Sequence, residues 1–515
     1  MKSLPWLTII TLLPALGAVV LVLLPRSRPA LVKTVALLFS VATLVLAGVM
    51  ASQYDTGAEA GTFQFTEQHS WIPSFGIEYA LGVDGIGLVM VLLTALLAPV
   101  VILAGWNDAE PSGRSVKTFF ALILALETLS LGVFAATDVF LFYILFEATL
   151  IPIYFLLGQY GGPRRSYAAV KFLVYSLVGG LVMLASVVGL YVLSNAEGEP
   201  SFLLSALRDL DIDPNTQKWL FLGFFVAFAI KAPMVPVHTW LPDAARESTP
   251  GTAVLLVSIL DKIGTFGMIR FCLQIFPEAS QWATPVVVVL AVVSVIYGAV
   301  LAIGQGVLQG DIKRLIAYTS ISHFGVMVLG IFAMTSTAQT GATLYMVNHG
   351  LSTAALFLVA GYLIARRGSA RISDFGGVDK VAPALSGTFL FACLAGLSLP
   401  GLAPFVSEFL ALSGTFTRYR WAAVIAAVAV ILAALYMLIL YQRTMTGPTR
   451  PAVESMRDLS PRESLAMVPL VVLILGLGLF PKPVIDVLSP AVESTMEQVG
   501  VTDPKPTVPV SEASK

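Results

Sequence analysis

Charged residues and cysteines are scarce in this chain, and their scarcity excludes most classes of soluble protein. Only 12% of the 515 residues are Asp, Glu, Lys or Arg, and 57% are hydrophobic, whereas a soluble protein is about 25% charged. The two cysteines, Cys272 and Cys393, lie far apart in apolar segments. By themselves they cannot ligate an iron–sulfur cluster, which needs about four ligands, or a structural zinc ion.

The motifs of soluble enzymes are also missing. The chain has no glycine-rich phosphate loop, no HExxH zinc motif, no nucleophile elbow and no basic nucleic-acid face. Long apolar runs are present instead, and several exceed the roughly 18 residues needed to cross a bilayer. The first run follows Lys2 without a convincing cleavage site, so it is interpreted as a spanning helix and not as a removed signal. The sequence therefore predicts an all-α polytopic membrane protein.

About fourteen transmembrane helices are predicted, near 4–24, 31–50, 82–104, 116–135, 138–158, 168–193, 218–236, 251–275, 283–304, 312–334, 341–364, 385–413, 421–441 and 464–481. Loops on one side hold 19 Lys and Arg residues, and loops on the other side hold 8. The positive-inside rule assigns the richer side to the cytoplasm, so both termini are expected on the opposite side. The tail 482–515 is expected to become ordered only against a partner.

Proline pairs interrupt two of the predicted spans, the seventh and the twelfth. In segment 231–243 two prolines follow Lys231, and in segment 399–408 two prolines precede Glu408. Proline breaks a helix, and a broken helix survives in a bilayer only where it is buried in protein or lines a wet cavity. A buried lysine costs about 2.5 to 3.5 kcal/mol on insertion scales and typically marks an ion pathway. The alternative is a lysine that only extends to the membrane interface.

The spacing of the ionisable residues predicts an internal repeat. Glu147 precedes Lys231 by 84 residues, and His323 precedes Glu408 by 85. Two inverted five-helix repeats are therefore expected, because five spans per copy reverse the orientation of the second copy. The predicted organisation is three spans in 1–110, the first repeat in 111–276, the second in 277–445, a last span in 446–481 and a polar tail in 482–515.

Several ionisable residues fall deep inside the predicted spans. Glu147 lies about nine residues into its span and Lys262 about eleven into its own, which places both near the bilayer centre at 1.5 Å per residue. His323 and His349 also lie in apolar segments. A lone histidine there is usually a hydrogen-bonded core residue. In series with the lysines and Glu408, histidine suits a proton relay because it titrates near neutral pH.

Three motifs resemble the antiporter-like membrane subunits of respiratory complex I and of multisubunit cation/proton antiporters. They are Lys231-x-Pro-x-x-Pro-x-His238-x-Trp-Leu-Pro-Asp243-Ala244, Gln309-x-Asp311-x-Lys313-Arg314-Leu-Ile-Ala-Tyr318-x-Ser320-x-Ser322-His323, and His349-Gly-Leu-Ser. The resemblance covers about residues 80–445. Glu408 in place of the commoner lysine, the Leu81-Gly82-Val83-Asp84-Gly85 segment and the end of the chain after fourteen spans favour the M-type, or chain-4-type, branch.

The resemblance implies a role for each buried residue. Glu147 and Lys231 would form an ion pair, and Lys262 would be the central relay. His323 and His349 would continue the path, which would end at Glu408. Secondary candidates are His238, Asp261 and Glu127. Asp261 departs from the family pattern, which has an apolar residue before the lysine. Adjacent helix positions point about 100° apart, so Asp261 need not pair with Lys262.

The implied function is proton translocation as a membrane subunit of NADH-quinone oxidoreductase. No cofactor is expected in this chain, and NADH, FMN, iron–sulfur clusters and quinone are expected in other subunits. The expected partners are L-type and N-type membrane neighbours in a bacterial plasma membrane, with no nucleic acid. Two alternatives stay open: a subunit of a sodium/proton antiporter or membrane-bound hydrogenase, and a structural spacer that moves no ion.

Overall fold

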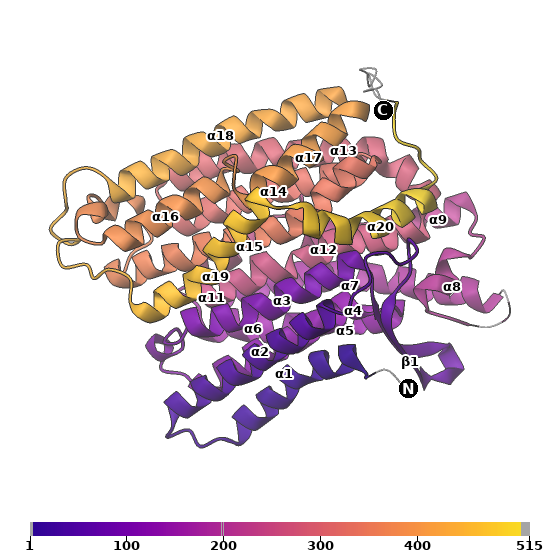
Figure 1. Cartoon of the computed structure of the whole chain (residues 1–515), viewed down its shortest axis with the longest axis horizontal. Helices are drawn as coiled ribbons and strands as arrows, with labels where there is room; N and C mark the ends of the chain where they lie inside the picture. The colour runs from indigo at the N-terminus through magenta and orange to yellow at the C-terminus, as the bar shows by residue number, and fades with distance from the viewer. Residues whose placement is uncertain (1–3, 197, 199, 506–515) are drawn as a thin grey trace.

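The computed structural model describes residues 4–196, 198 and 200–505. Its helices run nearly parallel to one another, and a β-hairpin lies at the end of the bundle where the described chain also begins and finishes (Figure 1). The hairpin pairs β1 (Gln64–Ile72) with β2 (Ile77–Val83) in antiparallel register. The sequence predicts only a loop in this region, so the hairpin is an addition to the expected all-α fold.

Twelve helices of the described chain are long and apolar enough to cross a membrane. Two interrupted spans, described below, complete the predicted fourteen. The twelve are α1 (Trp6–Leu23), α2 (Pro29–Ala51), α3 (Gly85–Ala104), α4 (Val116–Ala135), α5 (Val139–Ala148) with α6 (Leu150–Tyr160), α7 (Arg165–Ala196), α11 (Pro250–Val254) continuing through η3 (Leu255–Leu260), α12 (Lys262–Gly267) and η4 (Met268–Leu273), α13 (Pro277–Leu301) with η5 (Ala302–Leu308), α14 (Ile312–Phe332), α15 (Ser336–Arg367), α18 (Arg420–Met445) and α19 (Pro461–Leu479).

The first interrupted span consists of α9 (Pro214–Lys231) and α10 (Trp240–Glu247). The two prolines after Lys231 end α9, because they cannot continue its hydrogen bonds. The Trp240 indole donates to the Ile230 carbonyl at 3.0 Å, and the Val235 amide donates to the Ser294 hydroxyl of α13 at 3.0 Å. The backbone groups freed by the break are thus satisfied inside the protein, as a bilayer requires.

The second interrupted span consists of α16 (Pro383–Gly396) and α17 (Ala403–Arg418). The Asn348 side chain of α15 donates to the Ala403 carbonyl at 2.8 Å and so supports this break. Lys231 is the last residue of α9, before its break, whereas Glu408 lies in α17, after its break. The matching spacings of 84 and 85 residues predict that Lys231 and Glu408 are equivalent in the two repeats, and the structure shows that the two residues lie on different sides of their breaks.

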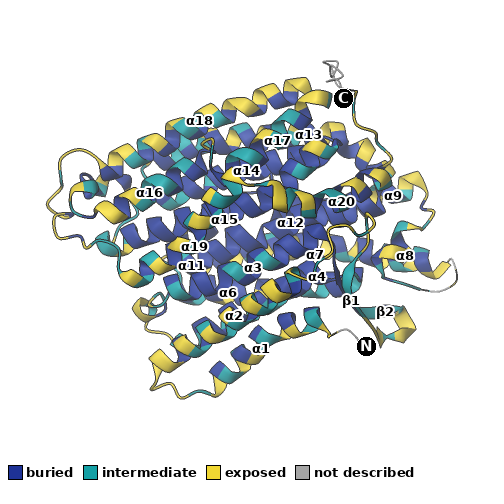
Figure 2. Cartoon of the chain, in the orientation of Figure 1, coloured by how far each residue is buried: buried dark blue, intermediate teal, exposed yellow. Residues whose placement is uncertain are grey.

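The two five-span units run from α4 to η4 and from α13 to α18, and each contains one broken span. α7 packs against α9 in the first unit as α15 packs against α17 in the second. α14, α15 and the α11–η4 span are buried throughout most of their length, whereas α1, α2 and α18 expose one face (Figure 2). Ionisable residues on the buried spans are consequently shielded from lipid.

The segment after α19 folds back on the same chain. Residues Lys482–Val499 form α20, which packs against α3, α13 and α15. The Gln274 amide donates to the Thr495 hydroxyl at 2.7 Å, and the Gln281 amide donates to the Val499 carbonyl at 2.7 Å. The expectation that the tail becomes ordered only against a partner is wrong for α20, because these contacts order it within the chain. Residues 506–515 lie outside the described chain.

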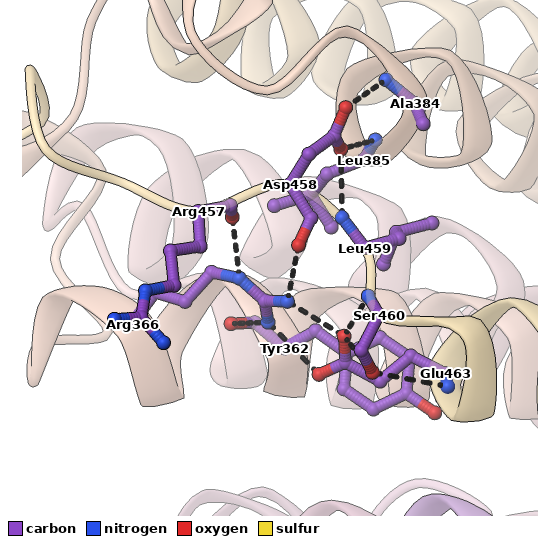
Figure 3. A network of polar contacts seen from close by, with 9 residues as sticks. All are labelled: Tyr362, Arg366, Ala384, Leu385, Arg457, Asp458, Leu459, Ser460 and Glu463. Carbon is purple, nitrogen blue, oxygen red and sulfur yellow. Dashed lines mark hydrogen bonds and ion pairs between the residues drawn. The ribbon is translucent and has the colours of Figure 1, made fainter.

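A polar network fastens α15 to α19 at the end of the bundle opposite the hairpin (Figure 3). The Arg366 guanidinium makes a bidentate contact with Glu463 at 3.0 and 2.6 Å and donates to the Arg457 carbonyl at 2.7 Å. The Asp458 carboxylate accepts from the amides of Ala384 and Leu385 at 3.0 and 2.8 Å. The free amides at the start of α16 are thereby capped.

Candidate functional site

Lys262 and His349 form the centre of the buried ionisable groups. Both side chains are 0% exposed, and the Lys262 Nζ lies 2.7 Å from the His349 Nδ1. Nζ also donates to the Val257 carbonyl at 2.7 Å, and the His349 Nε2 lies 3.1 Å from the Thr353 hydroxyl. The Lys262 amino group therefore contacts a histidine and a carbonyl directly, as a group that passes a proton onward must.

A π-helical turn makes the Val257 carbonyl available to Lys262. Within η3 the Asp261 amide donates to the Leu256 carbonyl, five residues back, at 3.1 Å. In a regular α-helix the Asp261 amide would instead donate to the Val257 carbonyl. The Val257 carbonyl therefore has no bond from the Asp261 amide, and the Lys262 side chain donates to it instead. π-Helical turns occur frequently at functional sites.

His323 and Tyr345 extend the centre toward Glu408. The rings of His323 and His349 are 5.2 Å apart between centroids and nearly perpendicular, and the His323 and Tyr345 rings are 5.7 Å apart. Glu408, which is 6% exposed, has the hydroxyls of Tyr345 and Ser398 around its carboxyl. It also lines an apolar cavity of about 490 Å³ between α17 and α18. The ionisable groups thus reach from the core to a cavity at the side of the bundle.

Lys231 and Glu147 lie on the other side of the centre. The Lys231 side chain is 1% exposed, and its Nζ lies 4.9 Å from the Phe146 ring centroid and 5.6 Å from that of Phe172. Within the described residues, neither the Lys231 Nζ nor the Glu147 Oε1 has a hydrogen-bond partner. The ion pair implied by the resemblance is therefore not closed in this structure, although the Glu147 charge acts on Lys231 through space.

The structure distinguishes the three secondary candidates. Asp261 is 0% exposed, and the charges that act on it are those of Lys262 and Lys231. His238 lies between α9 and α10 with its ring against Tyr297, at 5.0 Å between centroids. Glu127 of α4 is 1% exposed, and both its oxygens lack a hydrogen-bond partner within the described chain. Only Asp261 is adjacent to the central residues.

A buried ion pair between Asp84 and Arg270 was missed from the sequence. The Arg270 guanidinium binds both Asp84 oxygens, at 2.7 and 2.6 Å, and both side chains are almost fully buried. Asp84 also caps α3 by accepting from the Gly87 amide at 2.9 Å. The one available signal was an arginine inside a predicted span, since a residue of this kind requires a buried partner.

The described residues contain no group of three or more His, Cys, Asp or Glu side chains placed to hold a metal ion. The buried ionisable residues of the candidate site carry amines, imidazoles and carboxyls. These are the residue types that bind and release protons.

Within the described chain, fourteen spans, two of them broken, and a buried series of Lys, His and Glu residues define the antiporter-like class of membrane subunits. The family model described as "NADH:quinone oxidoreductase/Mrp antiporter, TM" matches residues 136–434. The chain is 52% identical to NADH-quinone oxidoreductase subunit M of Mycobacterium tuberculosis (strain H37Rv), with 99% of this chain and 97% of that protein covered. The chain belongs to the family of NADH-quinone oxidoreductase subunit M.

Two solved structures share the fold. Respiratory complex I from Thermus thermophilus contains a chain with a TM-score of 0.86 and 33% identity, covering 96% of this chain and 100% of that one. A chain of the Mrp complex from Dietzia sp. has a TM-score of 0.83 at 20% identity, covering 97% of this chain and 100% of that one. The second likeness, at this identity, shows the fold alone.

Proposed function

We propose that this chain is a proton-translocating membrane subunit of NADH-quinone oxidoreductase. Protons move along the buried row (Glu147, Lys231, Lys262, His349, His323 and Glu408), and redox chemistry in other subunits supplies the energy. The observation that carries this proposal is the direct 2.7 Å contact of Lys262 with His349 at the centre of the row. A spacer that moves no ion would have no use for such a contact, since buried ionisable groups cost stability.

The Glu147 and Lys231 pair acts as the switch of the proposed mechanism. A nearby carboxylate stabilises the charged ammonium, and separation of the two favours release of the proton. Moving a proton against 100 mV costs about 2.3 kcal/mol, which equals about 1.7 units of proton affinity on the pKa scale. Neither the Lys231 Nζ nor the Glu147 Oε1 has a hydrogen-bond partner among the described residues, so a small movement changes the separation of the two groups without breaking bonds at these atoms.

The central and final steps of the proposed path use Lys262, the two histidines and Glu408. Lys262 passes its proton to the His349 Nδ1, and the perpendicular ring of His323 continues the path toward Tyr345 and Glu408. Glu408, which is 6% exposed, is the terminal proton-exchange residue of the row. The two five-span units supply one broken helix each, so one half of the path is assigned to each unit.

The remaining chemistry is assigned to partner subunits. NADH, FMN, iron–sulfur clusters and quinone bind elsewhere in the complex, and L-type and N-type membrane subunits flank this chain. The protein lies in a bacterial plasma membrane with both termini on the non-cytoplasmic side. This orientation is supported by the hairpin end, where segment 51–81 has four acids and no Lys or Arg. The connections between α1 and α2 and between α18 and α19, which carry Arg26, Arg28, Arg450 and Arg457, lie at the opposite end (Figure 1).

The test is Lys231→Ala in the assembled complex, with NADH-driven proton uptake measured in membrane vesicles. Loss of pumping with assembly retained is expected. Lys218→Ala is the matched control, because Lys218 lies on the same helix but contacts Trp282 at the surface, at 5.5 Å from the ring centroid. Wild-type pumping by an assembled Lys231→Ala complex would contradict the proposal and favour the spacer. Sodium-dependent pumping would favour the antiporter alternative.

A second pair of variants tests the switch. Glu147→Gln removes the charge and is expected to impair pumping strongly, whereas Glu147→Asp keeps the charge and is expected to be milder. The reason is that Lys231 responds to a charge through space and not to a hydrogen bond of fixed length. Equal pumping by Glu147→Gln and the wild type would remove the switch from the mechanism.

A further inference from the structure

Asp261 is a buried acid whose two oxygens are both left without a hydrogen-bond partner by the described residues. Its side chain is 0% exposed, and it sits where η3 joins α12. A buried carboxylate in this condition costs stability unless it is paired. Membrane helices retain such residues mainly on ion pathways and proton relays.

The face of the helix that carries Asp261 meets the end of α9. Gly264, three residues later on the same face, packs so closely that an added Cβ would lie 2.6 Å from the Ala232 amide nitrogen and 2.6 Å from the Phe228 carbonyl oxygen. Ala232 directly follows Lys231. Asp261 therefore lies on the side of α12 where Lys231 ends α9, and its charge acts on Lys231.

Lys262 contacts a different helix, α15. The next position on a helix lies about 100° around the axis, and Lys262 contacts His349 of α15. Thr265, on the same face as Lys262, donates to the Met346 sulfur of α15 at 2.9 Å. Lys231 thus ends the helix that packs on the Asp261 side of α12, whereas Lys262 points to α15. Asp261 is placed between these two contacts.

We propose that Asp261 is a proton-transfer residue between Lys231 and Lys262. This inference rests on the function proposed above. In the first step the Lys231 ammonium gives a proton to the Asp261 carboxylate, which leaves a neutral amine and a neutral acid. In the second step the acid gives the proton to the neutral amine of Lys262, which restores the carboxylate and forms an ammonium. One proton moves, charge is conserved and no other bond changes.

The Asp261 carboxylate reduces the electrostatic repulsion between the two lysines of the path. Two ammonium groups repel each other in a low-dielectric interior, and a carboxylate between them stabilises either one. The proton then crosses from one lysine to the other as part of a neutral acid. The gaps between the side chains are closed by rotamer changes or by a water molecule, and the free oxygens of Asp261 can accept both kinds of contact.

The test uses Asp261→Asn and Asp261→Glu in the assembled complex in membrane vesicles, with protons taken up per NADH oxidised. Asp261→Asn keeps the shape but cannot carry the proton, so pumping is expected to fall about fivefold or more. Asp261→Glu keeps the acid and is expected to retain at least about half of the pumping, with a shifted pH profile. Cys272→Ala is the control, because Cys272 is buried in the same span outside the row.

The pH profile depends on a defined set of groups. The charges of Lys231 of α9 and Lys262 of α12 act on Asp261. Glu147 acts on Lys231, and His349 contacts Lys262. Moving the carboxyl by one methylene changes its distance to both lysines. A merely structural Asp261 would leave the profile of the Asp261→Glu complex unchanged.

The outcomes separate this inference from the proposed function. If Lys231→Ala abolishes pumping while Asp261→Asn pumps like the wild type, the relay is overturned and the proposed function stands. If Lys231→Ala also pumps normally, both fail. If Asp261→Asn does not assemble, the Asp261→Glu complex decides: a shifted pH profile supports the relay, and an unchanged profile overturns it.

Discussion

The Lys262 Nζ lies 2.7 Å from the Nδ1 of His349. When the ammonium donates to Nδ1, the histidine proton is on Nε2, where it can be donated to the Thr353 hydroxyl at 3.1 Å. The contact therefore couples the charge of the lysine to the tautomer of the histidine. Loss of a proton from Lys262 to Nδ1 creates an imidazolium that can release its other proton from Nε2.

Lys262→Met is expected to abolish pumping, because methionine fills the space but has no proton to give to His349. The loss is about 100-fold or more, in the range of a missing acid or base group. Proton uptake per NADH oxidised in vesicles measures the effect, and blue native electrophoresis checks assembly. Retention of normal pumping in the assembled variant would place the proton path away from Lys262.

Glu408→Gln and Glu408→Lys are both expected to lose most pumping. Glutamine cannot exchange a proton, and lysine brings a positive charge toward Tyr345 and the histidines where the wild type has a carboxyl. Ser413→Ala is the control, since Ser413 lies on the same helix and lines the same cavity. If Glu408→Lys pumped like the wild type in proteoliposomes, any ionisable residue would suffice at this position.

Asp84→Asn is expected to destabilise the fold. It leaves the Arg270 guanidinium buried without its carboxylate, and breaking a buried pair costs about 3 to 5 kcal/mol. A lowered thermal midpoint of the purified complex measures this loss, and Asp84→Asn combined with Arg270→Gln is expected to recover part of it.

Burial opposes ionisation of Asp84, but Arg270 outweighs it and holds the pKa of Asp84 below its ordinary value. The stabilisation is therefore present above the ordinary value and is lost as the pH falls through the lowered one.

Asp108→Asn is expected to stabilise the fold more at pH 7 than at pH 5. Asp108 lies in the loop after α3 at a cavity of about 750 Å³, and burial raises its pKa to about 6, although the Gly251 amide and the charge of Lys313 lower it. The folded chain then holds this proton more tightly than the unfolded chain, so stability falls as the pH rises from about 4 to about 6 and stays lower above that.

The Asp108→Asn variant lacks this loss, so its advantage at pH 7 exceeds that at pH 5 by roughly 1 kcal/mol. Thermal midpoints of both purified complexes at the two pH values measure the difference. An equal gain at pH 5 and pH 7 would mean that Asp108 keeps its ordinary acidity in the folded chain.

Features encoded by local composition were predictable from the sequence. Run length and hydropathy placed the spans, including α4 at Val116–Ala135, and proline pairs placed both breaks. Hydropathy also found the buried ionisable residues, because any charge inside an apolar run is conspicuous. These signals require no knowledge of which helices meet.

Features decided by packing were not predictable. The Leu255–Leu260 segment reads as regular helix, and its π-helical turn arises where the span fits between its neighbours. Asp84 and Arg270 are 186 residues apart, so their pairing is set by the fold. α20 contains an internal proline and polar residues that resemble a disordered tail, yet contacts with α3, α13 and α15 order it.

Gly180 of α7 leaves the space that the Glu147 carboxyl occupies. A methyl group at this position would overlap the Glu147 Oε1 and come within 2.9 Å of Oε2, so the acid rests against bare backbone of a neighbouring helix. The room available to the Glu147 carboxyl is therefore set by the backbone of α7, and Gly180 is the residue that leaves this room open.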